Sequence, residues 1–199
     1  MNTMLRKSVL GIAGLAFAGG LAAGPMNHST TAGPAVEAAP VAVAAQADKP
    51  AVDTGKLIPH GVQGEQSTIS LDSEQTGNVA AIIAATKKAG LDERAAVISI
   101  GTALQESKLE NLGHLGDRND HDSQGLFQQR PSSGWGTVEQ ITDAEYSTLA
   151  FLKGLKQVDG WQDMPLTEAA QTVQVSAYPD AYAQWEQFAA DLVAEHWNS

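Results

Sequence analysis

The sequence predicts an all-α domain in the C-terminal two-thirds of the chain, with at most a minor β-hairpin. Three observations lead to this fold class. Apolar residues recur at helical spacing from about residue 78 onward, capping residues and glycines mark the ends of these segments, and the alternating pattern of strands is hard to find. About five short helices around one long loop make such a domain.

The first 24 residues have the composition of a secretory signal peptide. Arg6 and Lys7 precede an apolar run, SVLGIAGLAFAGGLAAG, that ends at Gly24. This order is typical of a signal for export, and the run is shorter than the roughly 20 apolar residues that cross a bilayer as a helix. We therefore expect segment 1–24 to be removed, which leaves a secreted or cell-wall-associated protein with no stable membrane span. An uncleaved anchor is the alternative.

A flexible tether is expected to follow the signal. Residues 25–50 consist mostly of Ala, Pro, Val, Gly and Thr, a composition without the periodicity of a folded element. Residues 51–75 are more polar and also have no clear period. We therefore assign 25–75 to the tether and lead-in, and 76–199 to the folded domain.

The charge and composition of the chain exclude several classes of protein. The formal net charge is -11 and cysteine is absent, so that disulfides, thiolate chemistry and a lipid-modified cysteine are excluded. Between Thr76 and Ser199, 17 acidic residues outnumber 8 basic ones. Nucleic acid is not an expected partner, because phosphate binding needs clustered Lys and Arg. The domain as a whole also does not attract anionic wall polymers, which counts against a wall enzyme.

The first two predicted helices lead to a candidate catalytic residue. Helical spacing begins near Asn78, and two lysines followed by Gly90 are typical of a helix end. Asp92 is a suitable N-cap for a second helix over about 93–106. Small polar residues on one side of this second helix lead to the carboxylate of Glu106.

The remaining elements follow a long loop. Residues 107–124 are rich in Gly, Asn and Asp, which is typical of a loop. Thr137 and Asp143 are suitable N-caps for two further helices, the second of which has the sequence EYSTLAFLKGL. Helices are also expected over about 166–175 and 180–197, the last with an apolar face.

Two short motifs resemble those of soluble lytic transglycosylases and related lysozyme-like domains. They are Gln105-Glu106-Ser107 and, about twenty residues later, Ser123-Gln124-Gly125-Leu126-Phe127-Gln128. Ala177-Tyr178 is similar to the start of that family's third motif, and the resemblance covers roughly residues 93–187. The chain is also similar to secreted actinobacterial domains that contain a Gly-Leu-Phe-Gln-Gln-Arg-Pro segment. It departs from the family where Phe127 replaces the usual Met and Pro179 replaces an Asn.

The resemblance implies a lysozyme-like fold that cleaves the glycan strands of peptidoglycan without a cofactor. Glu106 would act first as acid and then as base, and the sugar's own 6-hydroxyl would close an anhydro ring. Chemistry requires such an acid to be partly protonated, which apolar surroundings favour. A hydrolase would need a second carboxylate, for which Asp117, Asp120 and Asp122 are candidates.

Further residues are candidates for substrate binding. Gly125 would let a ligand approach the backbone, and the amides of Gln128 and Gln129 suit N-acetyl and hydroxyl groups. Trp135 lies between two glycines and is a candidate for stacking on a sugar, whereas Tyr178 would either line a cleft, orient the acid or pack in the core. The resemblance adds Ser107 to this set.

Two other functions stay open for a chain that we expect to be a monomer. A non-catalytic domain that binds the wall or a partner would retain the fold, and Pro179 and the net acidity favour it. Residues 117–122 alternate oxygen ligands as a calcium loop does, which would suit a calcium-dependent binding module. The loop lacks the glycine at its sixth position, so we expect a solvated acidic loop and no metal site.

Overall fold

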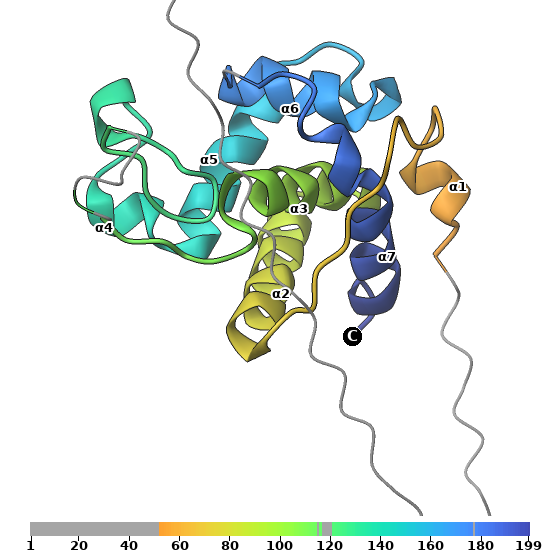
Figure 1. The fold of residues 1–199 in the computed structure, drawn as a ribbon, viewed down its shortest axis with the longest axis horizontal. Coiled ribbons are helices and arrows are strands. Elements are labelled where there is room, and N and C mark those ends of the chain that lie inside the picture. Colours follow the sequence, from red (N-terminus) through yellow and green to blue (C-terminus); the bar gives the residue numbers. More distant parts are fainter. Residues whose placement is uncertain (1–51, 115, 117–120, 177) are drawn as a thin grey trace, which may run out of the picture. The chain divides into compact units, whose positions relative to one another are not determined.

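The computed structural model describes residues 52–114, 116, 121–176 and 178–199. The predicted signal peptide and residues 25–51 lie outside these ranges. Within the described ranges every regular element is a helix (Figure 1). The described residues also contain one isolated antiparallel β-bridge, between Gln124 and Gln129. The predicted all-α fold class is confirmed, with the minor hairpin reduced to that one bridge. None of the described helices has the length and apolar character needed to span a membrane.

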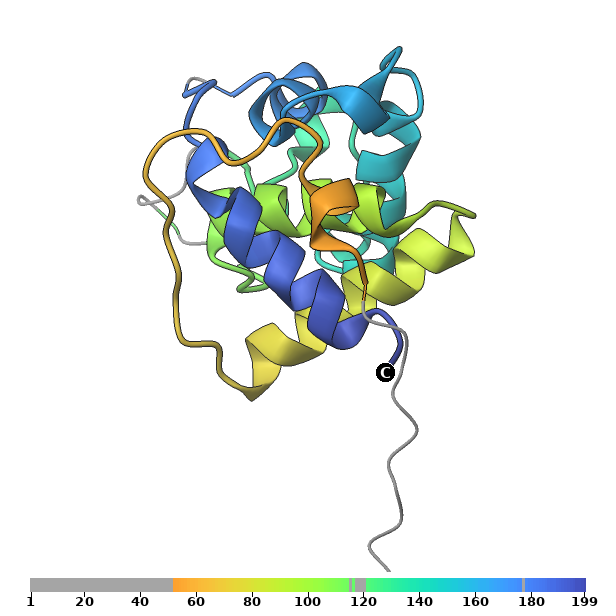
Figure 2. The same ribbon diagram turned by 90° about the vertical axis from the view of Figure 1, so that its right-hand side faces the viewer.

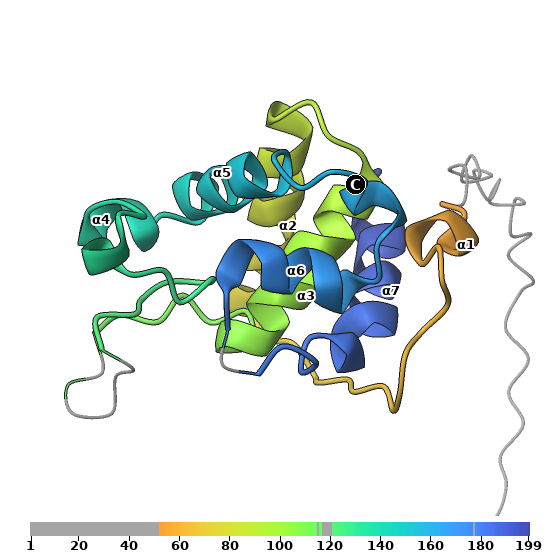
Figure 3. The same cartoon turned by 90° about the horizontal axis from the view of Figure 1, so that it is seen from above.

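Helix α3 (Glu93–Ser107) is the central element of the domain. It contacts α2 (Ser73–Lys88), α5 (Ala144–Leu155), α6 (Leu166–Gln174) and α7 (Glu186–His196), and these helices surround it in Figures 1, 2 and 3. Nearly all of its residues from Arg94 to Leu104 are buried. A helix enclosed on several sides must carry small or apolar residues all round, and its sequence ERAAVISIGTALQES does so.

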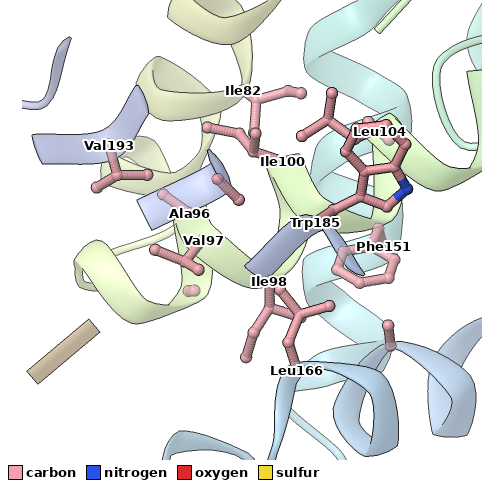
Figure 4. Close-up of a cluster of buried hydrophobic side chains, with 14 of the residues drawn as sticks. Ile82, Ala96, Val97, Ile98, Ile100, Leu104, Phe151, Leu166, Trp185 and Val193 are labelled. Atoms are coloured by element: carbon pink, nitrogen blue, oxygen red, sulfur yellow. The ribbon is translucent and has the colours of Figure 1, made fainter. Parts of the chain in front are cut away.

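The core is built on the side chains that α3 presents to its neighbours. Ile98 points toward Leu166 of α6 and Ile100 lies beside Ile82 of α2, and Leu104 and Phe151 of α5 belong to the same cluster of buried side chains (Figure 4). The approach of α6 is close, because a Cβ added at Gly101 would lie 2.5 Å from a methyl carbon of Leu166. The phenyl rings of Phe127 and Phe151 stack with their centroids 5.0 Å apart, which joins the loop after residue 121 to the same core.

Local capping sequences set the helix starts. The carboxylate of Asp92 accepts a hydrogen bond from the Ala95 amide, and Thr137 and Asp143 cap α4 (Val138–Ile141) and α5 in the same way, as predicted. Helix α2 begins at Ser73 rather than near residue 78, because Asp72 and Gln75 form a reciprocal capping box. Helix α7 begins at Glu186 rather than at residue 180, and the short 3-10 turn η4 (Ala183–Trp185) precedes it.

The segment before α2 belongs to the folded domain. It contains the short helix α1 (Thr54–Leu57), and the Leu57 side chain is buried. Farther along, the Ser67 amide donates to the Gln184 carbonyl at 2.7 Å, and Gln66 Nε2 donates to the Ala183 carbonyl at 3.0 Å. The domain therefore begins before the predicted boundary at residue 76. Hydrogen bonds to backbone carbonyls and the burial of isolated apolar residues such as Leu57 hold this segment, and such contacts leave no hydrophobic period in the sequence.

A buried ion pair between Arg94 and Glu186 joins the ends of several elements. The two side chains are 4% and 2% exposed, and Arg94 Nη1 lies 2.8 Å from Glu186 Oε1. Arg94 also donates to the Leu57 carbonyl at 2.6 Å and to the Met164 carbonyl at 2.7 Å. Burial lowers the pKa of Arg94, and the hydrogen bond and charge of Glu186 oppose that shift. One guanidinium thus ties α1, α3, α7 and the segment before α6 together.

Replacing Arg94 with methionine should lower the free energy of unfolding by about 3–5 kcal/mol, because the Glu186 carboxylate would stay buried without its partner. Urea denaturation of the wild type and the variant measures the difference. Lys88→Met is the matched control, since Lys88 and Glu145 form an exposed pair whose loss should cost less than about 1 kcal/mol. Equal losses in the two variants would contradict this role for Arg94.

Candidate active site

A polar cleft with a volume of about 650 Å³ opens beside the C-terminal end of α3. Three parts of the chain form its walls: the end of α3, the segment from Ser123 to Trp135, and the end of α6 with the residues after it. The described lining residues are Gln105, Glu106, Ser123, Gln128, Gln129, Arg130, Ser133, Trp135, Val173, Gln174, Val175, Ser176 and Tyr178. Five of the predicted site residues therefore meet at one cleft, and Ser107 and Gly125 are not among its described lining.

Glu106 is half-buried in the cleft and is held by a tyrosine. The hydroxyl of Tyr182 donates a hydrogen bond to Glu106 Oε1 at 2.5 Å. Burial raises the pKa of Tyr182 far above its ordinary value, and the charge and hydrogen bond of Glu106 raise it further. The phenol therefore keeps its proton at any physiological pH and remains a donor to the Glu106 carboxyl group.

Tyr182 is a site residue that the sequence analysis missed. The prediction chose Tyr178, which lines the cleft but is 74% exposed, whereas the Tyr182 side chain is fully buried. The available signal was a tyrosine on the predicted apolar face of the last helix, because a buried phenol needs a hydrogen-bond partner. A carboxylate at the end of a buried helix is such a partner.

The residue before Glu106 fixes this end of α3. Gln105 Oε1 accepts hydrogen bonds from Trp185 Nε1 at 2.9 Å and from Gln184 Nε2 at 3.1 Å. On the next turn, Lys108 Nζ lies 4.6 Å from the centroid of the Trp185 ring. Gln105 before Glu106 and the C-cap residue Lys108 after it are thus both attached to η4, and the carboxylate has a defined position.

Ser107 and Gly125 serve the scaffold rather than a ligand. Ser107 is buried, and its hydroxyl donates to the Leu126 carbonyl at 2.8 Å, which attaches the Gly-Leu-Phe segment to α3. Gly125 has φ +76°, and a Cβ there would lie 2.0 Å from the carbonyl oxygen of Ile141. The close approach at Gly125 is therefore to the protein's own backbone, and the contacts of both residues are with the scaffold.

The glutamines of the cleft hold backbone carbonyls with their amide groups. Gln128 Nε2 donates to the Gly125 carbonyl at 3.0 Å, and Gln174 Nε2 donates to the Phe127 carbonyl at 2.7 Å. Gln129 is buried, and its Nε2 donates to the Ser147 carbonyl at 3.1 Å. Its Oε1 is a buried acceptor without a partner among the described residues. The predicted residues Gln128 and Gln129 do line the cleft, but the amide nitrogens of all three glutamines already donate to backbone carbonyls.

Apolar and aromatic groups also border the cleft. Val175 is 79% exposed and has φ +53°, a left-handed conformation that strains a β-branched residue by about 1–3 kcal/mol. Trp135 is half-buried between Gly134 and Gly136, and it also lines a second cavity of about 600 Å³ with Tyr146 and other residues of α5. Both aromatic candidates thus border the polar cleft, as the sequence predicted.

Asp122 is bound through its carboxylate by two neighbouring residues, Arg130 and Ser132. Its carboxylate accepts hydrogen bonds from Arg130 Nε at 2.9 Å and from the amide and hydroxyl of Ser132, each at 2.8 Å. The Ser132 amide, then Arg130 and the Ser132 hydroxyl, hold the pKa of Asp122 well below its ordinary range. Asp122 is therefore an anion at neutral pH with its oxygens engaged. Among the described lining residues, Glu106 is the sole carboxylate.

Asp117 and Asp120, the other candidate carboxylates, lie outside the described residues, as does most of the loop that resembles a calcium site. Within the described part of the chain, no three His, Cys, Asp or Glu side chains lie together as metal ligands.

No family model matches the chain, and no match was found among curated proteins. The geometry of the cleft therefore carries the functional argument: one half-buried carboxyl group with a tyrosine donor, in a groove of amides and aromatic rings.

The raised pKa of Tyr182 predicts when this phenol ionises. In the wild type minus Tyr182→Phe difference, the phenolate absorbance should appear well above pH 10, the usual tyrosine value, or when the protein unfolds. Since the folded state holds this proton more tightly than the unfolded chain, Tyr182 contributes to stability below pH 10. That contribution is lost as the pH rises from about 10 toward the raised pKa.

Tyr178→Phe is the matched control, because this phenol is exposed and has no hydrogen bond to Glu106. Spectrophotometric titration of the three proteins gives the result directly. A Tyr182 difference signal with its midpoint near pH 10 in the folded protein would contradict the contact between Tyr182 and Glu106.

Proposed function

We propose that this chain is a secreted enzyme that cleaves the glycan strands of peptidoglycan, in the manner of a lytic transglycosylase. The observation that carries the proposal is Glu106: it is half-buried in a polar cleft, is positioned by the Tyr182 hydroxyl, and is the sole carboxylate among the described lining residues. The resemblance of the Glu106-Ser107 and Gly125–Gln128 motifs to that family supports the same chemistry.

A single carboxyl group suffices for the transglycosylase reaction. Protonated Glu106 would donate its proton to the glycosidic oxygen, so that the bond from this oxygen to the sugar's anomeric carbon breaks. The neighbouring 2-acetamido group would stabilise the anomeric carbon. The Glu106 carboxylate would then take the proton of the same sugar's 6-hydroxyl, whose oxygen closes the anhydro ring and regenerates the acid. No water and no cofactor enter the products.

The walls of the cleft suit a polar sugar chain. Its volume of about 650 Å³ lies within the range of ordinary ligand sites. Trp135 and Tyr178 both border it, and aromatic rings of this kind have apolar faces that pack on the C–H faces of sugars. Gln128 adds an amide oxygen and Ser133 adds a hydroxyl group to the lining. This combination recognises a glycan better than it recognises an apolar ligand.

Export follows from the same proposal. Peptidoglycan lies outside the cytoplasmic membrane, and the basic and apolar pattern of residues 1–24 is that of a secretory signal. The mature chain would then be a monomer at the cell wall, with residues up to about 51 as its tether.

A non-catalytic wall-binding or partner-binding domain is the second candidate. The observation that favours it is the scaffold role of Ser107 and Gly125, whose contacts with Leu126 and Ile141 would preserve both motifs in a domain without turnover. Pro179 and the net charge of -11 also fit this candidate. The two candidates differ in whether Glu106 breaks a bond.

Glu106→Gln should reduce the release of fragments from peptidoglycan by about 10²–10⁴-fold, because an amide cannot donate and regain the proton. Mass spectrometry of the soluble products checks this, and the wild type should give anhydro ends. Glu110→Gln is the matched control, because Glu110 is an exposed residue four positions later and does not line the cleft.

The other product patterns separate the alternatives. Reducing-end products that depend on Glu106 would replace the transglycosylase with a hydrolase. Glycan binding without any released product in the wild type would favour the non-catalytic domain.

A further inference from the structure

Arg130 is the sole cation among the described residues that line the cleft. It follows Gln128 and Gln129 on the wall formed by residues 123–135, and its side chain is 35% exposed. Neither of the motifs that suggested the function includes a role for it. A cation in the same cleft as the candidate acid is unexpected in a chain with a net charge of -11, which points to a role for its charge.

The Asp122 carboxylate orients the Arg130 guanidinium through a hydrogen bond at its Nε edge. Arg130 Nε donates to Asp122 Oδ1 at 2.9 Å, and the same carboxylate is fixed by the amide and hydroxyl of Ser132 at 2.8 Å each. The Arg130 terminal amino groups have no partner among the described residues. Since the guanidinium is planar, a hydrogen bond at Nε sets the direction of both terminal nitrogens.

These free donors match a carboxylate. Two nitrogens of a guanidinium pair with two oxygens of a carboxylate in a bidentate geometry that a neutral hydroxyl does not reproduce. The net negative charge of the protein gives a second reason for a cation in the cleft. A net negative protein repels an anionic polymer at long range, so that a cation in the cleft must supply the local attraction.

We propose that Arg130 forms an anion subsite of the cleft that binds a carboxylate of the glycan ligand. This inference rests on the proposed function and narrows its substrate class. The ligand is a glycan whose amino sugars carry carboxylates, rather than a neutral polymer of N-acetylglucosamine. In peptidoglycan the carboxylate has two sources: the peptide branches, or the lactyl group of a muramic acid from which the peptide has been removed.

Binding to three ligands of equal chain length tests the proposal. They are peptide-bearing peptidoglycan fragments, the same fragments after removal of the peptides, and neutral N-acetylglucosamine oligomers. Isothermal titration calorimetry with the full chain in a Glu106→Gln background measures each Kd without turnover. Arg130→Gln should weaken binding of at least one carboxylate-bearing ligand by about tenfold or more, and should change the Kd for the neutral oligomers less than twofold. The ligand that loses affinity identifies the source of the carboxylate.

Two further variants separate ligand binding from scaffolding. Arg130→Lys keeps the charge but loses the bidentate geometry, so its affinity for that ligand should lie between those of the wild type and Arg130→Gln. Asp122→Asn removes the charge of the orienting carboxylate but keeps the guanidinium, and it should retain more affinity than Arg130→Gln. The melting temperature of each variant reports whether it folds.

Defined outcomes would overturn the subsite. If Arg130→Gln and Arg130→Lys weaken the binding of all three ligands alike, Arg130 is a scaffold residue. If both variants keep the wild-type affinities, Arg130 does not contact the ligand. In both cases the proposed function survives, because the Glu106→Gln protein still binds glycan. If that protein and the wild type bind none of the three ligands, the proposed function fails and the subsite fails with it.

Discussion

The buried pair of Arg94 and Glu186 is the interaction on which the rest of the domain depends. Arg94 lies in the first turn of α3, and its hydrogen bonds fix α7, the end of α1 and the Met164 carbonyl around that turn. Because α3 is a continuous helix enclosed by its neighbours, a fixed first turn also fixes the last turn. Glu106 occupies the last turn, where the Tyr182 hydroxyl and the contacts of Gln105 with η4 hold it, so that both ends of α3 are attached to the C-terminal part of the chain.

The sequence predicted the elements whose signals are local. Asp92, Thr137 and Asp143 cap the helices that they were expected to cap, because a cap needs only its own next three residues. Helix α1 and the segment around Ser67 were missed, since their hydrogen bonds are to backbone groups more than a hundred residues away or to Arg94. Such contacts depend on the tertiary fold and leave no period in the sequence.

The site was predicted only in part, for a related reason. The motifs located the cleft, and Glu106, Gln128, Gln129, Trp135 and Tyr178 do border it. A motif does not say which of its residues face a ligand, and Ser107 and Gly125 instead contact Leu126 and Ile141. Tyr182 was missed because sequence spacing identifies a buried side chain but not the atom that its hydroxyl reaches.

The contacts of Arg94 also determine the order of events as the chain is made. Its partners are at residues 57, 164 and 186, so the guanidinium cannot meet its carboxylate until residue 186 has been synthesised. Contacts of such long sequence separation delay folding. The contacts around Arg94 therefore form only after the segment through Glu186 has left the ribosome. If residues 1–24 direct export as proposed, the late formation of these contacts would leave the polypeptide unfolded, and therefore able to pass through a translocation channel.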